Sequence, residues 1–397
     1  SYMRITALIS ELIFFIPGVI MYTRWMGRNL NKAPSIDQTI ITAAILFLPD
    51  LQIIDHGHFQ YNSVMLGLSL LALVNLLHNN LGLASIFYTL SIGYKQMALY
   101  YAPIFFFYLL SLCVIPKFNM LKLIYISVSV ASSVCFLLAP FLYHGGLSQV
   151  KQILLRMFPF GRGIFEDKVG NFWCATNIII KYKQIFSTTQ LQRQSLILTL
   201  IGISPSCIAI FLKPDKRLLS WCLASCSMSF YLFSFQVHEK SILLPWMPIA
   251  LLLNEVDSDV ISMVCWFFNV SLFSMTPLLI RDGLIMQCIV LCILSNWLMG
   301  NLSWVRKYTN IFVPFVSKRD NAITVLPHSY FWKIAIIGFY LGAGVILTCQ
   351  LFVAPPLNLP DLWVIGNVLL SFASFFLFYL WTFYKIHVIF KSKVKID

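Results

Sequence analysis

The sequence predicts an all-α, polytopic membrane protein, and three observations lead to this prediction. Of the 397 residues, 59% are hydrophobic and only 11% are charged, whereas a soluble domain is about half apolar and a quarter charged. The apolar residues are grouped into runs, and many of these approach the roughly twenty residues that a helix needs to cross a bilayer. Several Trp and Tyr side chains fall near the ends of these runs, where interfacial anchors lie. Helices satisfy their backbone hydrogen bonds internally, so apolar runs in lipid are expected to be helical.

About thirteen such segments follow one another along the chain, some of them short. Polar or basic residues interrupt the apolar sequence between them, and the sequence contains no internal repeat, low-complexity tract or separate soluble domain. We therefore expect residues 1–397 to form one integral-membrane domain. The predicted segments are approximately 7–26, 36–50, 63–78, 81–94, 96–114, 121–141, 194–212, 218–235, 241–253, 260–280, 284–303, 331–352 and 363–384.

Lys and Arg in the short loops predict which ends of the segments face the cytosol. If every segment crosses the membrane, the basic short loops all lie on one side. This places the tail 385–397 in the cytosol and the loop 142–193 on the luminal side. The long loop is basic as well, an exception that long loops tolerate, and its charge suggests an anionic ligand. The residues that mark the cytosolic side are Arg24, Arg28, Lys32, Lys117, Lys122, Lys213, Lys216, Arg217, Arg306, Lys307, Lys318, Arg319, Lys385, Lys391, Lys393 and Lys395.

The net charge of +13 would suggest nucleic acid in a soluble protein. In a membrane protein, the positive-inside rule and anionic lipid explain it better, so we expect membrane lipid and no nucleic acid as a partner. All of the ten cysteines except Cys174 lie inside apolar runs, which is no disulfide framework.

The sequence predicts no metal site. No His or Cys cluster has the spacing of a zinc site. Asp257-Ser-Asp259 has the Asp-x-Asp pattern of metal-dependent sugar-nucleotide transferases, but it falls on the predicted cytosolic side and directly precedes a helix. Aspartate at that position caps a helix N-terminus, and we interpret the motif as a cap.

The most conspicuous polar stretch lies at residues 53–63, between two apolar runs. Ionisable groups beside or inside a membrane are costly and usually functional. Asp55 or His58 could act in acid–base chemistry, and amide side chains bond well to sugar hydroxyls. The alternative is a polar loop whose Asp55 and Asn62 merely cap helices. The candidate residues of this stretch are Asp55, His56, His58, Gln60, Tyr61 and Asn62.

Lys95 and Gln96 stand between the apolar runs 81–94 and 97–114. A lysine at this depth could pair with a phosphate or with Asp55. Alternatively, it is a lysine whose ammonium reaches the membrane interface while its stem lies in apolar surroundings.

The stretch 158–173 combines charged side chains with aromatic rings. Aromatic rings stack on sugar faces, carboxylates accept bonds from hydroxyls, and glycines allow the backbone to approach a ligand closely. An interfacial loop with local ion pairs is the alternative. The candidate residues are Arg162, Glu166, Asp167, Lys168 and Trp173.

Two further polar sites lie on the predicted luminal side. His238, Glu239 and Lys240 could bind a phosphate or move a proton, unless they form only a polar turn. Arg4, just before the first span, could contact a phosphate, although an isolated interfacial Arg is commonly an anchor. These groups predict an enzyme or a transporter for an anionic, lipid-linked substrate. A transporter would show repeats and broken helices near mid-membrane; the gathering of polar groups at one face favours the enzyme.

Five stretches resemble the dolichyl-phosphate-glucose-dependent glucosyltransferases of the endoplasmic reticulum. Within that family, they are most similar to the enzymes that add the first glucose, in α-1,3 linkage, to Man9GlcNAc2-PP-dolichol; the second-glucose enzyme is the alternative. The stretches are IDHGHFQYNSVMLGL at 54–68, KQMALYYAPIFF at 95–106, FPFGRGIFEDKVGNFWC at 158–174, SFYLFSFQVHEK at 229–240 and APPLNLPDLW at 354–363.

The resemblance implies a GT-C fold in the endoplasmic reticulum membrane with an active site facing the lumen. It implies dolichyl-phosphate-glucose as donor, a dolichyl-pyrophosphate oligosaccharide as acceptor, inversion at the anomeric carbon, and no metal or other cofactor. The general base of the family is an acidic residue in the first luminal loop. That loop and one span would precede Ser1, which would give about fourteen spans in a complete protein. Asp55, His58 and His238 are then expected to support catalysis, and the other candidate residues to bind substrate; without the base, a non-catalytic scaffold is a further alternative.

Overall fold

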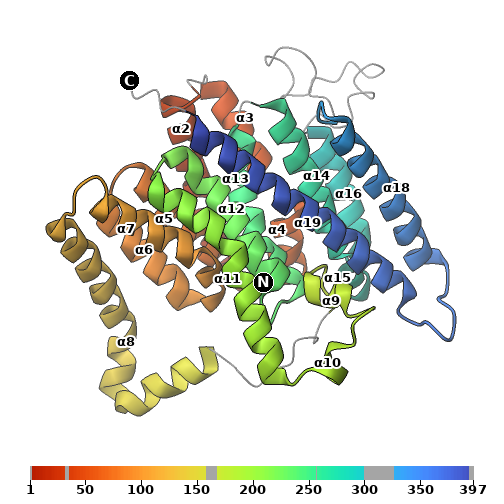
Figure 1. Ribbon diagram of the computed structural model, residues 1–397, viewed down its shortest axis with the longest axis horizontal. Coiled ribbons are helices and arrows are strands. Elements are labelled where there is room, and N and C mark those ends of the chain that lie inside the picture. Colours follow the sequence, from red (N-terminus) through yellow and green to blue (C-terminus); the bar gives the residue numbers. More distant parts are fainter. Residues whose placement is uncertain (1, 32–34, 158–167, 256, 299–325, 393–397) are drawn as a thin grey trace.

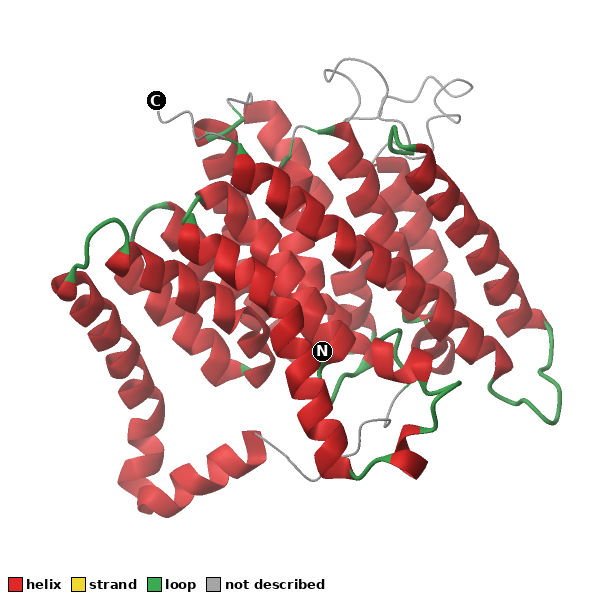
Figure 2. Ribbon diagram, viewed as in Figure 1, coloured by secondary structure: helices red, strands yellow, loops and turns green. Residues whose placement is uncertain are grey.

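The computed structural model describes residues 2–31, 35–157, 168–255, 257–298 and 326–392, and every regular element among them is a helix. Figure 2 shows helices that run between two ends of the molecule, joined by loops at these ends. Within these described ranges, seven helices are long and apolar enough to cross a membrane, and four shorter apolar helices accompany them. The predicted all-α, polytopic membrane protein is confirmed, while the number of crossings stays a prediction.

The helices follow the predicted apolar segments along the chain. In order, they are α1 (Tyr2–Ser10), η1 (Glu11–Phe15), α2 (Ile16–Asn29), α3 (Ser35–Leu46), α4 (Pro49–Gln52), η2 (Ile53–Gly57), α5 (Asn62–Leu77), α6 (Leu81–Tyr94), η3 (Gln96–Tyr101), α7 (Ala102–Val114), α8 (Met120–Met157), α9 (Phe172–Thr176), α10 (Tyr182–Ile185), α11 (Thr188–Leu212), α12 (Lys216–Phe233), η4 (Glu239–Ile242), α13 (Leu243–Leu251), η5 (Leu252–Asn254), α14 (Ser258–Ser274), α15 (Thr276–Arg281), α16 (Ile285–Leu298), α18 (Tyr330–Phe352) and α19 (Leu362–Lys391).

Helices α12 and α13 form the centre of the bundle. Every residue of α13 is buried, and α12 packs against α11, α13 and α19. Figure 1 shows α12 and α13 in the middle, with α8 at one margin and α18 at the other. The side chains of Trp221, Trp246 and Trp266 are among the largest that are fully buried. They belong to one hydrophobic core, to which aromatic and aliphatic side chains from both halves of the chain contribute.

Glycines allow neighbouring helices to approach closely, as is usual for helix pairs in membranes. A Cβ atom on Gly67 of α5 would lie 2.6 Å from the backbone carbon of Phe14. On α6, Gly82 faces Tyr125 of α8 and Gly93 faces Leu137 of α8. These contacts fix η1 against α5 and α8 against α6.

The predicted segment 36–50 is broken in the structure. Helix α3 ends at Leu46, Leu48 is extended, and Pro49 begins α4. The residue before a proline avoids helical backbone angles, and a proline lacks the N–H that an unbroken helix would need. The break turns the chain so that η2 carries Asp55 to the end of the bundle.

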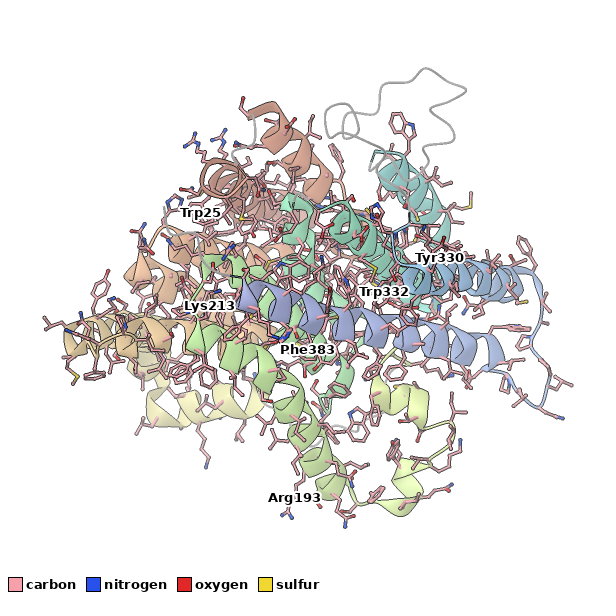
Figure 3. The ribbon with its side chains drawn as sticks, turned by 45° about the horizontal axis from the view of Figure 1, so that its top comes forward. Trp25, Arg193, Lys213, Tyr330, Trp332 and Phe383 are labelled. Carbon is pink, nitrogen blue, oxygen red and sulfur yellow. The ribbon has the colours of Figure 1, made fainter. Side chains whose placement is uncertain are left out.

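The predicted loop 142–193 contains more helix than expected. Helix α8 continues to Met157, with a kink at Gly146 where φ is +61°. At the other end, Ser187 and Gln190 form a capping box that begins α11. Figure 3 shows Arg193 and Lys213 near opposite ends of α11.

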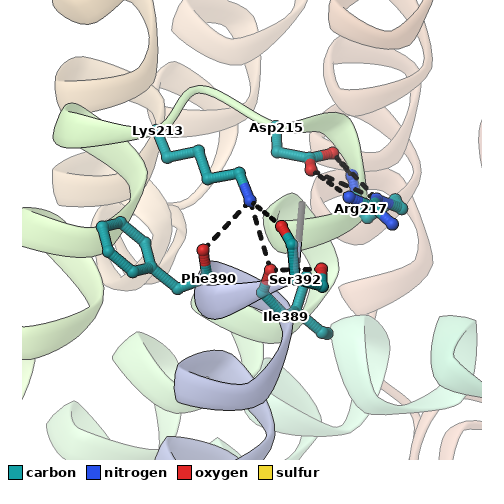
Figure 4. A network of polar contacts seen from close by, with 6 residues as sticks. All are labelled: Lys213, Asp215, Arg217, Ile389, Phe390 and Ser392. Atoms are coloured by element: carbon teal, nitrogen blue, oxygen red, sulfur yellow. Dashed lines mark hydrogen bonds and ion pairs between the residues drawn. The ribbon is translucent and has the colours of Figure 1, made fainter. Parts of the chain in front are cut away.

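Hydrogen bonds from Lys213 join the end of α11 to the C-terminal end of α19. The Nζ of Lys213 donates to the carbonyl oxygens of Ile389, Phe390 and Ser392 at 3.3, 3.0 and 2.7 Å (Figure 4). Cations stabilise helix C-termini because the last carbonyl groups lack partners within the helix. Beside it, Asp215 pairs with Arg217 at 2.7 Å. Burial alone would raise the pKa of Asp215, but the bonds from Arg217 hold it below its usual range.

Candidate active site

A cavity of about 390 Å³ opens where four parts of the chain meet. They are the turn between η2 and α5, the junction of α6 and η3, the start of η4, and the end of α15. Its apolar lining comes from Met65, Met97, Leu243, Leu244 and Leu278. The polar side chains that line it are His58, Gln60, Asn62, Lys95, His238, Glu239, Lys240, Ser241, Arg281 and Asp282.

Asp55 supports one wall of the cavity from behind. Its carboxylate is 1% exposed and accepts a bond from Asn62 Nδ2 at 2.8 Å and one from the backbone N–H of Ser63 at 2.7 Å. Asn62 Nδ2 also donates to Gln60 Oε1 at 3.1 Å, and Asn62 Oδ1 accepts from Lys95 Nζ at 2.5 Å. Asp55 therefore holds the amide that in turn holds Lys95.

A second group of polar contacts in the cavity lining is organised around His58. Its Nδ1 pairs with Oδ2 of Asp282, and its Nε2 lies 2.9 Å from Nζ of Lys240. The side chains of His58 and Asp282 are 22% and 25% exposed. A single imidazole thus connects the carboxylate that directly follows α15 with an ammonium of η4.

The backbone between η2 and α5 is shaped to present these side chains. η2 is a π-helix, in which His58 N–H donates to the carbonyl of Ile53. Phe59 then has φ of +70°, a conformation that is costly for an ordinary residue and clusters at functional sites. The reversal places His58 and Gln60 together in the cavity wall.

Positive charge in the cavity suits an anionic ligand. Lys95, Lys240 and Arg281 face it together with the acidic Glu239 and Asp282. Burial lowers the pKa of Lys95, which the nearby Asp55 carboxylate partly opposes. Lysine and arginine donors together with amide groups can hold a phosphate and the hydroxyls of a sugar.

The structure brings seven of the predicted residues together in this cavity. They are His58, Gln60, Asn62, Lys95, His238, Glu239 and Lys240.

Other predicted residues lie elsewhere. His56 Nε2 pairs with the buried Glu11 of η1 at 2.6 Å. Tyr61 bonds to Thr6 at 3.0 Å. Gln96 is half-buried at the start of η3 and does not line the cavity.

Two residues of the predicted aromatic stretch are in structural contacts. Lys168 pairs with Asp361 at the beginning of α19. Trp173 is 1% exposed and donates to the carbonyl of Phe233 at 2.8 Å, within a small cluster with Tyr182 and Leu191. Arg162, Glu166 and Asp167 lie outside the described residues. Arg4 lies in α1, and its side chain is outside those described.

Sequence reasoning missed Arg281 and Asp282 as site residues. The available signal was a charged pair between the apolar runs 260–280 and 284–303, on the same predicted side as the other clusters. Pairing with His58 joins residues 224 positions apart, so only the fold reveals it.

The Asp257-Ser-Asp259 motif is a helix cap, as predicted. Asp257 begins α14 and accepts from the N–H of Asp259 at 2.9 Å, and its other oxygen pairs with Lys385 at 2.7 Å. Within the described parts of the chain, no group of three or more His, Cys, Asp or Glu side chains could hold a metal ion. Independence from metal stays a prediction.

Comparison with known proteins gives a consistent result. The model of the ALG6, ALG8 glycosyltransferase family matches residues 1–383. The chain is 48% identical to the dolichyl pyrophosphate Man9GlcNAc2 alpha-1,3-glucosyltransferase of Saccharomyces cerevisiae, over 97% of this chain and 72% of the relative. It is 36% identical to the protein of that name from Pongo abelii and 34% identical to that from Gallus gallus, each over 99% of this chain and 76% of the relative.

Proposed function

The chain belongs to the ALG6, ALG8 glycosyltransferase family, and from this premise we propose that it transfers glucose in α-1,3 linkage to Man9GlcNAc2-PP-dolichol for protein N-glycosylation. The relatives above bear the name of the first-glucose enzyme, which supports that reaction over addition of the second glucose. The family predicted from the sequence is thereby confirmed.

The donor that we propose is dolichyl-phosphate-glucose. The observation that carries this proposal is the cavity in which Lys95 and Lys240 face a space bordered by the side chains of Gln60 and Asn62. Two ammonium groups match a phosphate, and the amides match glucose hydroxyls. The isoprenoid chains of donor and acceptor would lie in the membrane between helices.

The proposed step exchanges one bond at the anomeric carbon of glucose. The bond from C1 to the phosphate oxygen breaks, and its electron pair leaves with dolichyl phosphate. A bond from C1 to a mannose hydroxyl oxygen of the acceptor forms on the opposite face, so the β-linked donor gives an α-linked product.

Charge develops on the phosphate as it leaves, and preorganised cations stabilise such charge in the transition state. Lys95, Lys240 and Arg281 are the described cations of the cavity that would do this. The proton of the acceptor hydroxyl goes to a general base. His238 and Glu239 would orient the sugar or the acceptor at the same wall.

We place the reaction on the luminal side of the endoplasmic reticulum membrane. The chain is a multi-pass membrane protein by its apolar helices. The positive-inside rule puts the cavity opposite the basic short loops. Glycosylation tags inserted in 142–193 and in the tail 385–397 test the orientation, because only luminal tags are modified.

A defined transfer assay tests the proposed function. The full-length protein is purified and mixed with dolichyl-phosphate-glucose and Man9GlcNAc2-PP-dolichol, with and without EDTA. We expect a product one hexose heavier, whose added glucose is released by an α-1,3-specific glucosidase, at equal rates in both samples. No glucosylated product from folded protein would overturn the transferase, whereas transfer that EDTA abolishes would overturn only the metal-free prediction.

A further inference from the structure

The two ring nitrogens of His58 contact groups of opposite charge. Nδ1 pairs with the carboxylate of Asp282, and Nε2 lies 2.9 Å from the ammonium of Lys240. An ammonium group has only hydrogen atoms to donate, so Nε2 must accept. The proton of a neutral imidazole is then on Nδ1, where it is donated to Asp282.

This arrangement has one consistent set of donors and acceptors. A proton on Nε2 would point an N–H at an ammonium, so either the other tautomer or the imidazolium would lose the bond to Lys240. A carboxylate behind Nδ1 fixes the required tautomer and ring orientation, as second-layer carboxylates do for other functional histidines. His58 can therefore hold Lys240 only while Asp282 holds His58.

We propose that Asp282 is a positioning residue of the transferase: through His58, it directs the Lys240 ammonium into the cavity, where the donor phosphate would bind. This inference rests on the proposed function. It also assigns His58 as a hydrogen-bond acceptor for Lys240, rather than as the general base that takes the proton of the oligosaccharide hydroxyl.

The fold explains how Asp282 reaches its place. It follows α15, whose last residue is Arg281, and Gly283 has φ of +70°. Glycine adopts that conformation without strain, and the reversal returns the chain so that Leu284 packs on Gly57 next to His58. The packing of the Leu284 side chain on Gly57 thus holds Asp282 and His58 near each other besides their own bond.

The rival explanation is that the Asp282–His58 bond only fastens α15 to the turn before α5. A fastener would support the fold whether or not Lys240 is present. A positioning residue loses its effect on transfer when Lys240 is removed, because the group on which it acts is gone. A double-mutant cycle separates these two roles.

The test uses Asp282→Asn, Lys240→Met and the double variant in the full-length protein. Donor KM and kcat are measured, together with the thermal unfolding midpoint. Loss of a charge-assisted bond is expected to raise the donor KM roughly tenfold in Asp282→Asn, and the double variant is expected to match Lys240→Met. Asp215→Asn is the matched control: it weakens an ion pair at the start of α12, away from the residues that line the cavity, and keeps a good capping residue.

The outcomes separate this inference from the proposed function. No transfer by the wild-type protein would overturn the proposed function itself. If the wild type transfers glucose but the increases in donor KM of the two single variants multiply in the double variant, only the positioning role is overturned. An unchanged donor KM in Asp282→Asn would overturn that role as well. Should Asp282→Asn not fold, His58→Leu, whose side chain has no acceptor for Lys240, gives the same cycle with and without Lys240→Met: matching costs support the relay, and multiplying costs contradict it.

Discussion

Nζ of Lys95 lies 2.5 Å from Oδ1 of Asn62, and the amide of Asn62 donates to Asp55. Three residues from two parts of the sequence thereby form a row of hydrogen bonds that ends at the cavity. The buried carboxylate does not face the substrate space; it fixes the amide, and the amide fixes the ammonium.

Asn62→Ala should therefore disturb both neighbours. Lys95 would lose its acceptor and Asp55 would lose one donor while it stays buried. An unsatisfied buried polar group costs about 1–3 kcal/mol, so a lower unfolding midpoint and reduced transfer are both expected. Thermal unfolding and the transfer rate of the purified variant check this. A wild-type unfolding midpoint and a wild-type transfer rate would show that the hydrogen bonds of Asn62 have no energetic role.

Transfer should fall at high pH because of Lys95. Burial disfavours its charged form and lowers its pKa, so Lys95 loses its proton at a lower pH than an exposed lysine does. Above that pH, its neutral amine no longer stabilises the leaving phosphate. Arginine remains charged throughout this range, so Lys95→Arg should retain a larger fraction of its maximal rate at high pH. Superimposable pH–rate profiles would exclude Lys95 as the group that titrates.

The Asp-x-Asp motif should tolerate loss of its charge. Asp257→Asn keeps a side chain that caps helices well and removes only the carboxylate partner of Lys385. We expect the transfer rate of the wild type, with or without EDTA. A variant that folds but transfers at less than a tenth of that rate would restore the metal-site interpretation.

Acid should weaken the same ion pair. Burial would raise the pKa of Asp257, but the bond from Lys385 lowers it overall. Because the folded-state pKa lies below the unfolded one, the pair contributes stability above the unfolded pKa, and this contribution disappears as the pH falls through the folded pKa. The unfolding midpoint of Asp257→Asn should thus approach that of the wild type in acid and lie below it at neutral pH. A difference independent of pH would contradict this account.

Gly67 should be intolerant of any side chain. The added Cβ of Gly67→Ala would lie 2.6 Å from backbone carbon of Phe14, and overpacking of this kind costs about 1–3 kcal/mol. Gly338→Ala on α18 is the matched control, because nothing lies within 4 Å of its added Cβ. The unfolding midpoint should fall in the first variant and not in the second. Equal midpoints would show that η1 and α5 can separate without cost.

Much of the fold could be predicted because the apolar runs are sharply bounded. The segment 81–94 was predicted with the bounds that α6 has, since Asn80 and Lys95 interrupt the apolar sequence on either side. The extension of α8 to Met157 was not predicted, because that part is amphipathic and carries Lys151 and Arg156.

The cavity could be predicted only in part. Polar residues in an apolar chain stand out, which is why His58, Lys95 and Lys240 were all identified. Which of these polar side chains reach the cavity depends on tertiary contacts: His56, two residues before His58, pairs with Glu11 instead. The partnership with Asp282 likewise exists only in the folded chain.

The central claim is that Lys95 and Lys240 hold the phosphate of the donor. The most direct measurement is kcat/KM for dolichyl-phosphate-glucose in the full-length Lys95→Met/Lys240→Met variant, beside Lys122→Met, whose lysine caps the end of α7 by donating to Leu112. We predict a loss of at least about a hundredfold in the double variant, as for two charge-assisted bonds, and no loss in Lys122→Met. A folded double variant with the kcat/KM of the wild type would contradict the claim.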